Sequence, residues 1–223
     1  MPTSARDEVI EVISSTLDRY TVGDPMDEGI KCGPMVSAGQ HESVSWYIAS
    51  GIAEGANLVS GGEGMAVGLS SGFFFKPTVF AVVTAEMTVF REEIFGPVLT
   101  ISTYETEEEA IAMANDSEYG LSGGVWSGDD ERAMRVARAM RTGQVSINGG
   151  AFNISAPFGG YKMSGNGREL GLHGMEEFLE IKSIQRLSLI HISEPTRRYA
   201  IAVSGVGVEK KWGGGGGGGV GGW

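Results

Sequence analysis

The sequence predicts an α/β fold built on a mostly parallel sheet. Two observations support this. Strand-like and helical patterns alternate from Asn57 to Asn148, an order typical of βαβ units. The 223 residues, of which 41% are hydrophobic, are also enough for one sizeable globular core.

Two amphipathic helices are expected before the alternating region. Residues Arg6–Tyr20 carry apolar side chains at helical spacing, and Gly23-Asp24-Pro25 ends this pattern. Residues Ser37–Glu54 predict a second helix, whose apolar face consists of Val44, Tyr47, Ile48 and Ile52.

The alternating region contains five expected strands and two expected helices. Thr106 is expected to cap a helix that ends at Ala114, because three glutamates follow it where the helix dipole favours acidic groups. A further helix is expected over Asp129–Met140. β-Branched and apolar runs predict strands at Ala56–Ser60, Thr78–Val83, Val98–Tyr104, Leu121–Trp126 and Gln144–Ile147.

The texture changes after Asn148. Residues Ala151–Gly171 are rich in Gly, Pro and polar side chains and predict a long loop, which in compact domains is usually functional or disordered. Strand-like alternation follows and ends at Leu187. From residue 188 no pattern fits, residues 188–199 resemble a translated sequencing adapter, and Gly213–Gly219 is unbroken glycine. We therefore divide the chain into a partial catalytic domain (1–172), a strand (173–187) and a disordered, artefactual tail (188–223).

Charge and composition exclude several classes of function. A formal charge of −11 disfavours binding to nucleic acid or anionic membranes. No apolar run predicts a membrane span, and no signal peptide is expected. The single cysteine, Cys32, allows no internal disulfide, so a cytoplasmic protein is expected. No metal site is expected, because His41, His173 and His191 lack the spacing of metal ligands.

Two motifs carry the functional prediction. In Glu92–Leu99, the Gly96-Pro97 turn places a carboxylate and an aromatic ring just before a strand. A carboxylate there can accept hydrogen bonds from ribose hydroxyls, and a ring can support a flat heterocycle. In Ala156–Gly171, the glycines permit close backbone approach. Taken alone, the first motif is better explained by a solvated glutamate and a core phenylalanine beside a strand, and the second is weak evidence against a glycine-rich surface loop.

Together and in this order, the two motifs resemble the aldehyde dehydrogenase superfamily over residues 5–186. Segments such as Lys76-Pro77-Thr78-Val79 and Gly143–Asn148 match in family order as well. The resemblance implies the C-terminal part of a three-layer catalytic domain that uses NAD or NADP. It also implies that Glu93 binds the nicotinamide ribose and that Phe95 lies against the nicotinamide ring. Asn148, Phe152 and Phe158 would border the substrate tunnel.

The same resemblance implies that the chemical groups of the reaction lie elsewhere. The family's nucleophilic cysteine and general-base glutamate precede the position that Met1 matches, and Cys32 does not lie in the nucleophile's sequence context. We therefore assign no catalytic residue and expect an inactive fragment of an enzyme that oxidises an aldehyde to a carboxylic acid. The family's strand at Phe178–Leu187 implies a homo-oligomer, dimer or tetramer, of the full-length protein.

Two alternatives remain open at this stage. The chain is compatible with a non-catalytic domain that pairs with full-length aldehyde dehydrogenase subunits. An unrelated phosphate-binding α/β protein is disfavoured, because Gly165-Asn166-Gly167 does not follow a strand.

Overall fold

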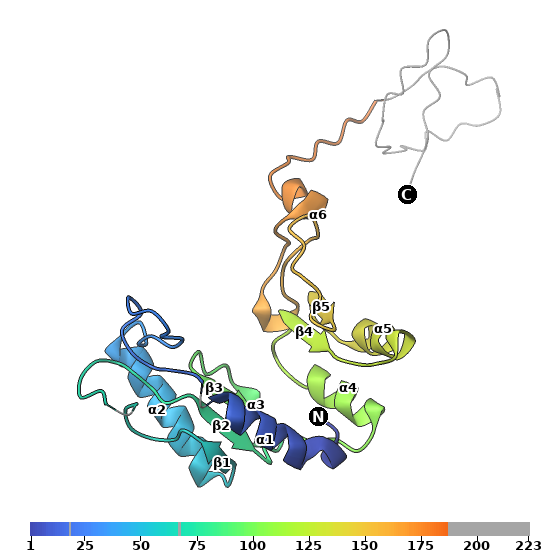
Figure 1. Ribbon diagram of the computed structural model, residues 1–223. Helices are drawn as coiled ribbons and strands as arrows, with labels where there is room; N and C mark the ends of the chain where they lie inside the picture. The colour runs from blue at the N-terminus through green and yellow to red at the C-terminus, as the bar shows by residue number, and fades with distance from the viewer. Residues whose placement is uncertain (18, 67, 187–223) are drawn as a thin grey trace, which may run out of the picture.

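A computed structural model describes residues 1–17, 19–66 and 68–186 (Figure 1). The expected tail at 188–223 lies outside these residues. The described chain forms two neighbouring units, each with its own small sheet. This corrects the expectation of one sheet. Parallel pairing is nevertheless the commoner arrangement, because β2 pairs with β3 and β4 with β5 in parallel, whereas β1 is antiparallel to β2.

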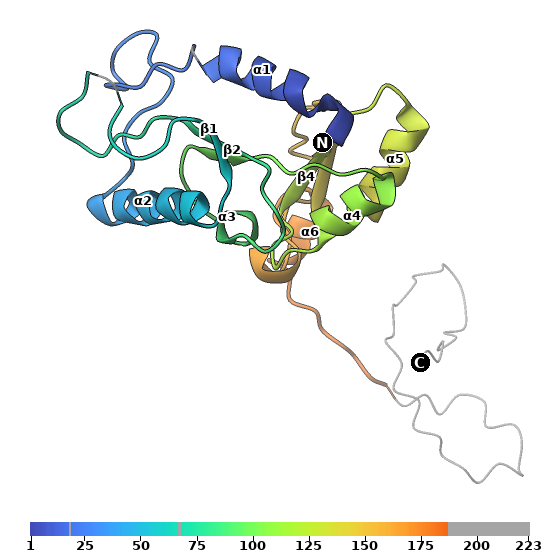
Figure 2. The same ribbon diagram turned by 90° about the horizontal axis from the view of Figure 1, so that it is seen from below.

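The first unit is a three-stranded sheet between two helices (Figure 2). Its strands are β1 (Asn57–Ser60), β2 (Thr78–Ala81) and β3 (Val98–Thr100), in that spatial order. The helices are α1 (Arg6–Leu17) and α2 (Ala38–Ala53). α2 begins where Ser37 accepts a hydrogen bond from the Gln40 backbone N–H, as expected for an N-cap.

Strand β2 explains why both helices pack on this sheet. All four of its residues are buried. Phe80 packs on Val44 and Ile48 of α2. Val79 and Ala81 belong to a second cluster, against which Ile10, Ile13 and Leu17 of α1 pack. Alternate side chains of one strand therefore hold helices on opposite faces.

A short helix that the sequence pattern did not predict, α3 (Thr88–Arg91), leads into the first motif. Glu54, just after α2, caps it: the carboxylate accepts the Thr88 backbone N–H and hydroxyl, each at 2.6 Å. These hydrogen bonds lower the pKa of Glu54. The carboxylate therefore joins the end of α2 to the start of α3.

The second unit contains α4 (Glu107–Asn115), β4 (Ser122–Val125), α5 (Asp130–Ala139) and β5 (Gln144–Ile147). The helices begin at true caps, because Thr106 accepts from the Glu109 N–H and Asp129 from the Arg132 N–H. The expected helices and strands of this unit are thus confirmed to within a few residues.

Two cationic side chains bind the end of α4: Arg91 reaches it from the first unit, and Lys162 from within the second. Arg91 donates to the Asp116 carbonyl at 3.0 Å and forms an ion pair with its carboxylate at 2.9 Å. Lys162 donates to the carbonyls of Asn115 and Ser117, each at 2.7 Å. Positive charge at a helix C-terminus is favourable, so these contacts stabilise both α4 and the junction.

The C-terminal region departs most from expectation. A short 3-10 helix, η2 (Lys162–Ser164), interrupts the expected loop, and α6 (Gly171–Glu176) stands where loop and strand were expected. Residues 178–186 form no strand within the described chain. A strand needs a hydrogen-bonded neighbour, and its alternating pattern alone does not supply one.

Candidate functional site

The turn at residues 92–96 presents alternate side chains to opposite sides. Glu92 accepts a hydrogen bond from the Tyr47 hydroxyl of α2 at 2.8 Å, and Ile94 packs against the buried cluster. Glu93 and Phe95 are exposed. The backbone at Glu92 is extended, with φ −108° and ψ 156°, which explains why neighbouring side chains diverge.

Phe95 combines high exposure with an unusual backbone. Its side chain is 73% exposed and its φ is 51°, in the left-handed region that bulky residues rarely adopt. The Gln40 side-chain amide holds this conformation from α2 by donating to the carbonyls of Ile94 at 3.3 Å and Phe95 at 3.0 Å. An exposed ring in a strained, fixed backbone is poised to contact a ligand.

The Glu93 carboxylate is available to such a ligand. Among the described residues it makes neither a hydrogen bond nor an ion pair, whereas Glu92 beside it is occupied by Tyr47. A free carboxylate two residues from an exposed aromatic ring fits a sugar hydroxyl next to a flat heterocycle. The structure therefore brings Glu93 and Phe95 together on one turn.

Asn148 follows β5 directly and is also left-handed, with φ 50°. Its side-chain oxygen accepts the Ser127 N–H at 2.9 Å, and its side-chain nitrogen donates to the Ser127 carbonyl at 3.0 Å. These two bonds fix the ends of β4 and β5 side by side. Asn148 itself remains exposed, so it lies at the surface where the two parallel strands end.

Phe152 and Phe158 meet in the loop that follows. Their rings pack edge to face at 5.6 Å, and Phe152 is 54% exposed. Phe158 is fixed by a two-way backbone pairing with Glu169. The structure thus brings these two predicted residues together near the surface, on a different sheet unit from Glu93 and Phe95.

Close backbone packing requires glycine at Gly143, just before β5, and at Gly160 of the second motif, whereas a Cβ on Gly165 would meet nothing within 4 Å. A Cβ on Gly143 would lie 1.6 Å from the carbonyl oxygen of Gly159, and one on Gly160 would lie 2.4 Å from that of Ser164. The glycines therefore let the loop lie directly on the start of β5.

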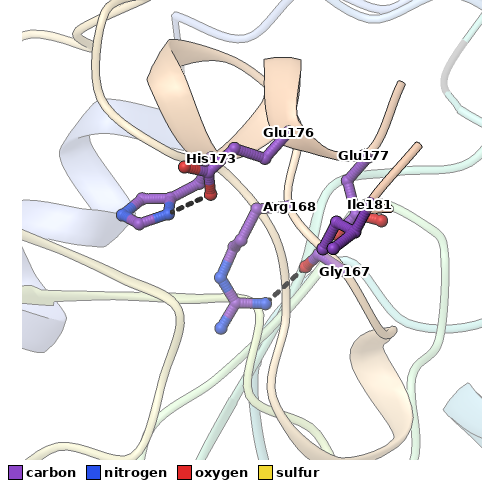
Figure 3. A pocket seen from close by; sticks show the side chains of 6 residues that line it. All are labelled: Gly167, Arg168, His173, Glu176, Glu177 and Ile181. Carbon is purple, nitrogen blue, oxygen red and sulfur yellow. Dashed lines mark hydrogen bonds and ion pairs between the residues drawn. The ribbon is translucent and has the colours of Figure 1, made fainter. Parts of the chain in front are cut away.

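Two surface pockets of the described chain do not include the predicted site residues in their linings. One of about 380 Å³ lies beside α6 and is lined by Gly167, Arg168, His173, Glu176, Glu177 and Ile181 (Figure 3). Its charged groups serve the fold: Arg168 donates to the carbonyls of Gly160 and Gly167, and His173 lies 3.3 Å from Glu176. The other, of about 600 Å³, is lined by the Arg91, Asp116 and Lys162 junction and by Glu92.

Cys32 belongs to a structural bridge. It pairs with Val22 in an isolated parallel bridge, and its carbonyl accepts the Gly23 N–H at 3.1 Å. It is half-buried and is not in a disulfide.

Sequence reasoning missed the polar contacts of α2: it placed Tyr47 on the apolar face and assigned no role to Gln40. Their spacing could have revealed these contacts, because Gln40 and Tyr47 lie four residues before and three after Val44, on the same face of the helix.

Comparison with known proteins identifies relatives along most of the chain. A family model described as the aldehyde dehydrogenase family matches residues 1–184. A 3-succinoylsemialdehyde-pyridine dehydrogenase from a Pseudomonas species is 53% identical over 184 residues, which is 82% of this chain and 39% of that protein.

The solved structures that resemble this chain are also aldehyde dehydrogenases. An aldehyde dehydrogenase C mutant from Pseudomonas syringae, solved with NAD+ and octanal, shares 48% identity at a TM-score of 0.78 over 80% of this chain and 37% of that chain. A Mycobacterium tuberculosis aldehyde dehydrogenase with NAD+ shares 50% identity at a TM-score of 0.76, over 79% of this chain and 36% of that one. The chain thus spans less than two fifths of each of these relatives. Within the described residues, no helix is long and apolar enough to cross a membrane.

Proposed function

We propose that this chain, which belongs to the aldehyde dehydrogenase family, contributes the nicotinamide-side surface and part of the substrate tunnel to an enzyme that oxidises an aldehyde to a carboxylic acid. The observation that carries the proposal is the turn at 92–96. It exposes the Glu93 carboxylate, which has no bonding partner among the described residues, and a strained aromatic ring two residues further on.

Glu93 would bind the nicotinamide ribose through its carboxylate, and Phe95 would lie against the ring. NAD or NADP is the proposed cofactor, since two of the similar enzymes were solved with NAD+. A bound nicotinamide supplies the hydride acceptor. The residues of this chain orient it: a fixed ribose and a ring wall limit the directions from which a substrate hydrogen can approach.

Asn148, Phe152 and Phe158 would border the aldehyde. The edge-to-face pair of phenylalanines offers apolar surface. The fixed Asn148 amide lies at the shared end of β4 and β5. Among the relatives, the Pseudomonas syringae enzyme was solved with octanal, an apolar aldehyde. We propose no catalytic residue in this chain, and we expect the chain alone to have no turnover with either cofactor.

The proposed roles can be tested in a chimera in which residues 1–184 replace the matched segment of the Pseudomonas syringae enzyme. Glu93→Gln keeps the size of the side chain but weakens a charge-assisted hydrogen bond. We expect hydride transfer to slow about tenfold, equivalent to roughly 1.4 kcal/mol, while cofactor affinity falls less. A deuterated aldehyde should then show a larger isotope effect.

Glu86→Gln is the matched control, because Glu86 is an exposed glutamate just before α3. It should leave turnover unchanged. If Glu93→Gln in the active chimera also leaves turnover and the isotope effect unchanged, Glu93 has no ribose role and is a solvated turn carboxylate.

A further inference from the structure

The turn that presents Glu93 and Phe95 rests on one face of α2. Gln40, Val44 and Tyr47 are spaced four and three residues apart, so they lie above one another on the helix. Each contacts a different part of the turn. Gln40 donates to the carbonyls of Ile94 and Phe95, and Tyr47 donates to the Glu92 carboxylate.

Val44 sets the distance between helix and turn. A Cβ added to Gly96 would lie 2.6 Å from one Val44 methyl and 2.9 Å from the other, so only glycine allows this approach. Val44 is fully buried. The turn is therefore held at a fixed height over α2, with the two polar contacts on either side of this apolar one.

The two hydrogen bonds decide which side chains face outward. Glu92 is directed to Tyr47 and Ile94 packs against the core, whereas Glu93 between them is exposed. Gln40 then holds the Phe95 carbonyl, whose residue has φ 51°. Without that donor, a phenylalanine would relax towards negative φ, and its ring would change direction.

We propose that Gln40 and Tyr47 are positioning residues that set the orientation of Phe95 and Glu93 for the nicotinamide half of the cofactor. This inference rests on the proposed function. Neither residue needs to touch the cofactor, because each acts through the backbone or side chain of the turn. The bond to Glu92 also raises the pKa of Tyr47, so the hydroxyl remains protonated and able to donate at neutral pH.

The experiment uses the full chain, labelled with ¹⁵N and ¹³C, with NAD+ as the probe. Tyr47→Phe removes only the hydroxyl, and Gln40→Met keeps a side chain of similar length without the donor. Tyr20→Phe is the matched control: Tyr20 is an exposed tyrosine beside Lys31, away from the turn. Glu92→Gln serves as the conservative variant, since its amide oxygen still accepts from Tyr47.

Two readouts are measured for each protein. The backbone shifts of Phe95 report its left-handed conformation, and the NAD+-dependent shifts of the Glu93 and Phe95 amides give an apparent Kd. We expect Tyr47→Phe and Gln40→Met each to move the Phe95 shifts toward an extended or helical backbone. Each should weaken NAD+ binding about fivefold, the effect of one hydrogen bond. Tyr20→Phe should stay close to the parent chain, and Glu92→Gln should have a smaller effect than Tyr47→Phe, because its amide oxygen still accepts from the Tyr47 hydroxyl.

The possible results of this experiment distinguish a failure of the positioning role from a failure of the proposed nicotinamide role. If NAD+ shifts neither amide in the parent chain, the nicotinamide role fails, and the Phe95 backbone shifts alone still decide whether Gln40 and Tyr47 orient the turn. If both variants leave those shifts unchanged, the positioning role is rejected. A lower melting temperature with unchanged Phe95 shifts and unchanged Kd would also reject it, because it shows a purely structural contact.

Discussion

Two of the predicted site residues, Phe95 and Asn148, have a left-handed backbone. Among the described residues, the non-glycine residues with positive φ are Val82, Phe95, Asn148, Lys162 and Leu170. Asn148 adopts this conformation more readily than most residues do, and its side chain also bonds Ser127 across the ends of β4 and β5. Phe95 has no such compensation in its own side chain. Its conformation depends on Gln40, which is why a residue outside the motif matters to it.

The hydrogen bonds of Glu54 predict a pH-dependent protection of the start of α3. Its pKa is lowered in the folded chain by hydrogen bonds from the side chain and backbone of Thr88. The stabilisation is therefore present above the unfolded pKa, about 4.3, and is lost as the pH falls through the folded value. The Thr88 amide should exchange with solvent faster as the pH is lowered through this range, after correction for intrinsic exchange. Glu54→Gln should show fast exchange already at neutral pH.

Glu42→Gln provides the comparison, since Glu42 is an exposed glutamate on α2 with no hydrogen bond to α3 among the described contacts. Its Thr88 amide should behave as in the parent chain. Equal protection of Thr88 in Glu54→Gln and in the parent at neutral pH would contradict the capping role.

Among the helices and strands, the sequence correctly predicted the features that depend on neighbouring residues, above all the starts of the helices. The caps at Ser37, Thr106 and Asp129 fix helix starts through side-chain bonds within three residues, and these starts are confirmed. Helix α3 was missed because four residues carry no periodicity. Helix α6 was missed because it contains glycine at 171 and 174, where helix propensity is low. Close packing nevertheless requires glycine at position 174, because a Cβ there would meet the Glu169 backbone at 2.6 Å.

The close approach of β5 to the glycine loop predicts that a larger side chain at Gly143 destabilises the fold. A Cβ on Gly143 would lie 1.6 Å from the Gly159 carbonyl oxygen, so Gly143→Ala must push the loop away. We expect a loss of about 2–3 kcal/mol, which lowers the melting temperature by roughly 4–12 °C. Gly128→Ala is the control, because nothing lies within 4 Å of its added Cβ. Equal melting temperatures for the two variants would show that the loop does not rest on β5.

For the whole molecule, the sequence indicated the alternation of strands and helices but not how the strands group. Two sheets of three and two strands replace the one sheet expected. Pairing is a long-range property, and no local pattern in Val98–Thr100 or Ser122–Val125 states which neighbour each strand has. The predicted site divides in the same way: the motif at Glu92–Leu99 belongs to one unit, and Asn148 and the phenylalanine pair belong to the other. Arg91, which joins the units through Asp116, lies in no pattern that the sequence analysis recognised.

The last prediction concerns residues 178–186, which expose apolar side chains without a strand neighbour in the described chain. Phe178 is 90% exposed, Ile181 100% and Ile184 64%. Such a segment offers a backbone edge without a strand neighbour among the described residues, together with apolar area, and this combination favours strand addition from another copy. We expect the full chain to self-associate, and Ile181→Lys to shift it toward monomer by about tenfold in Kd, measured by light scattering across a concentration series. Lys182→Arg, beside it but charge-preserving, should not. If the parent chain is monomeric throughout the series, or Ile181→Lys associates as the parent does, this segment is not an oligomerisation strand.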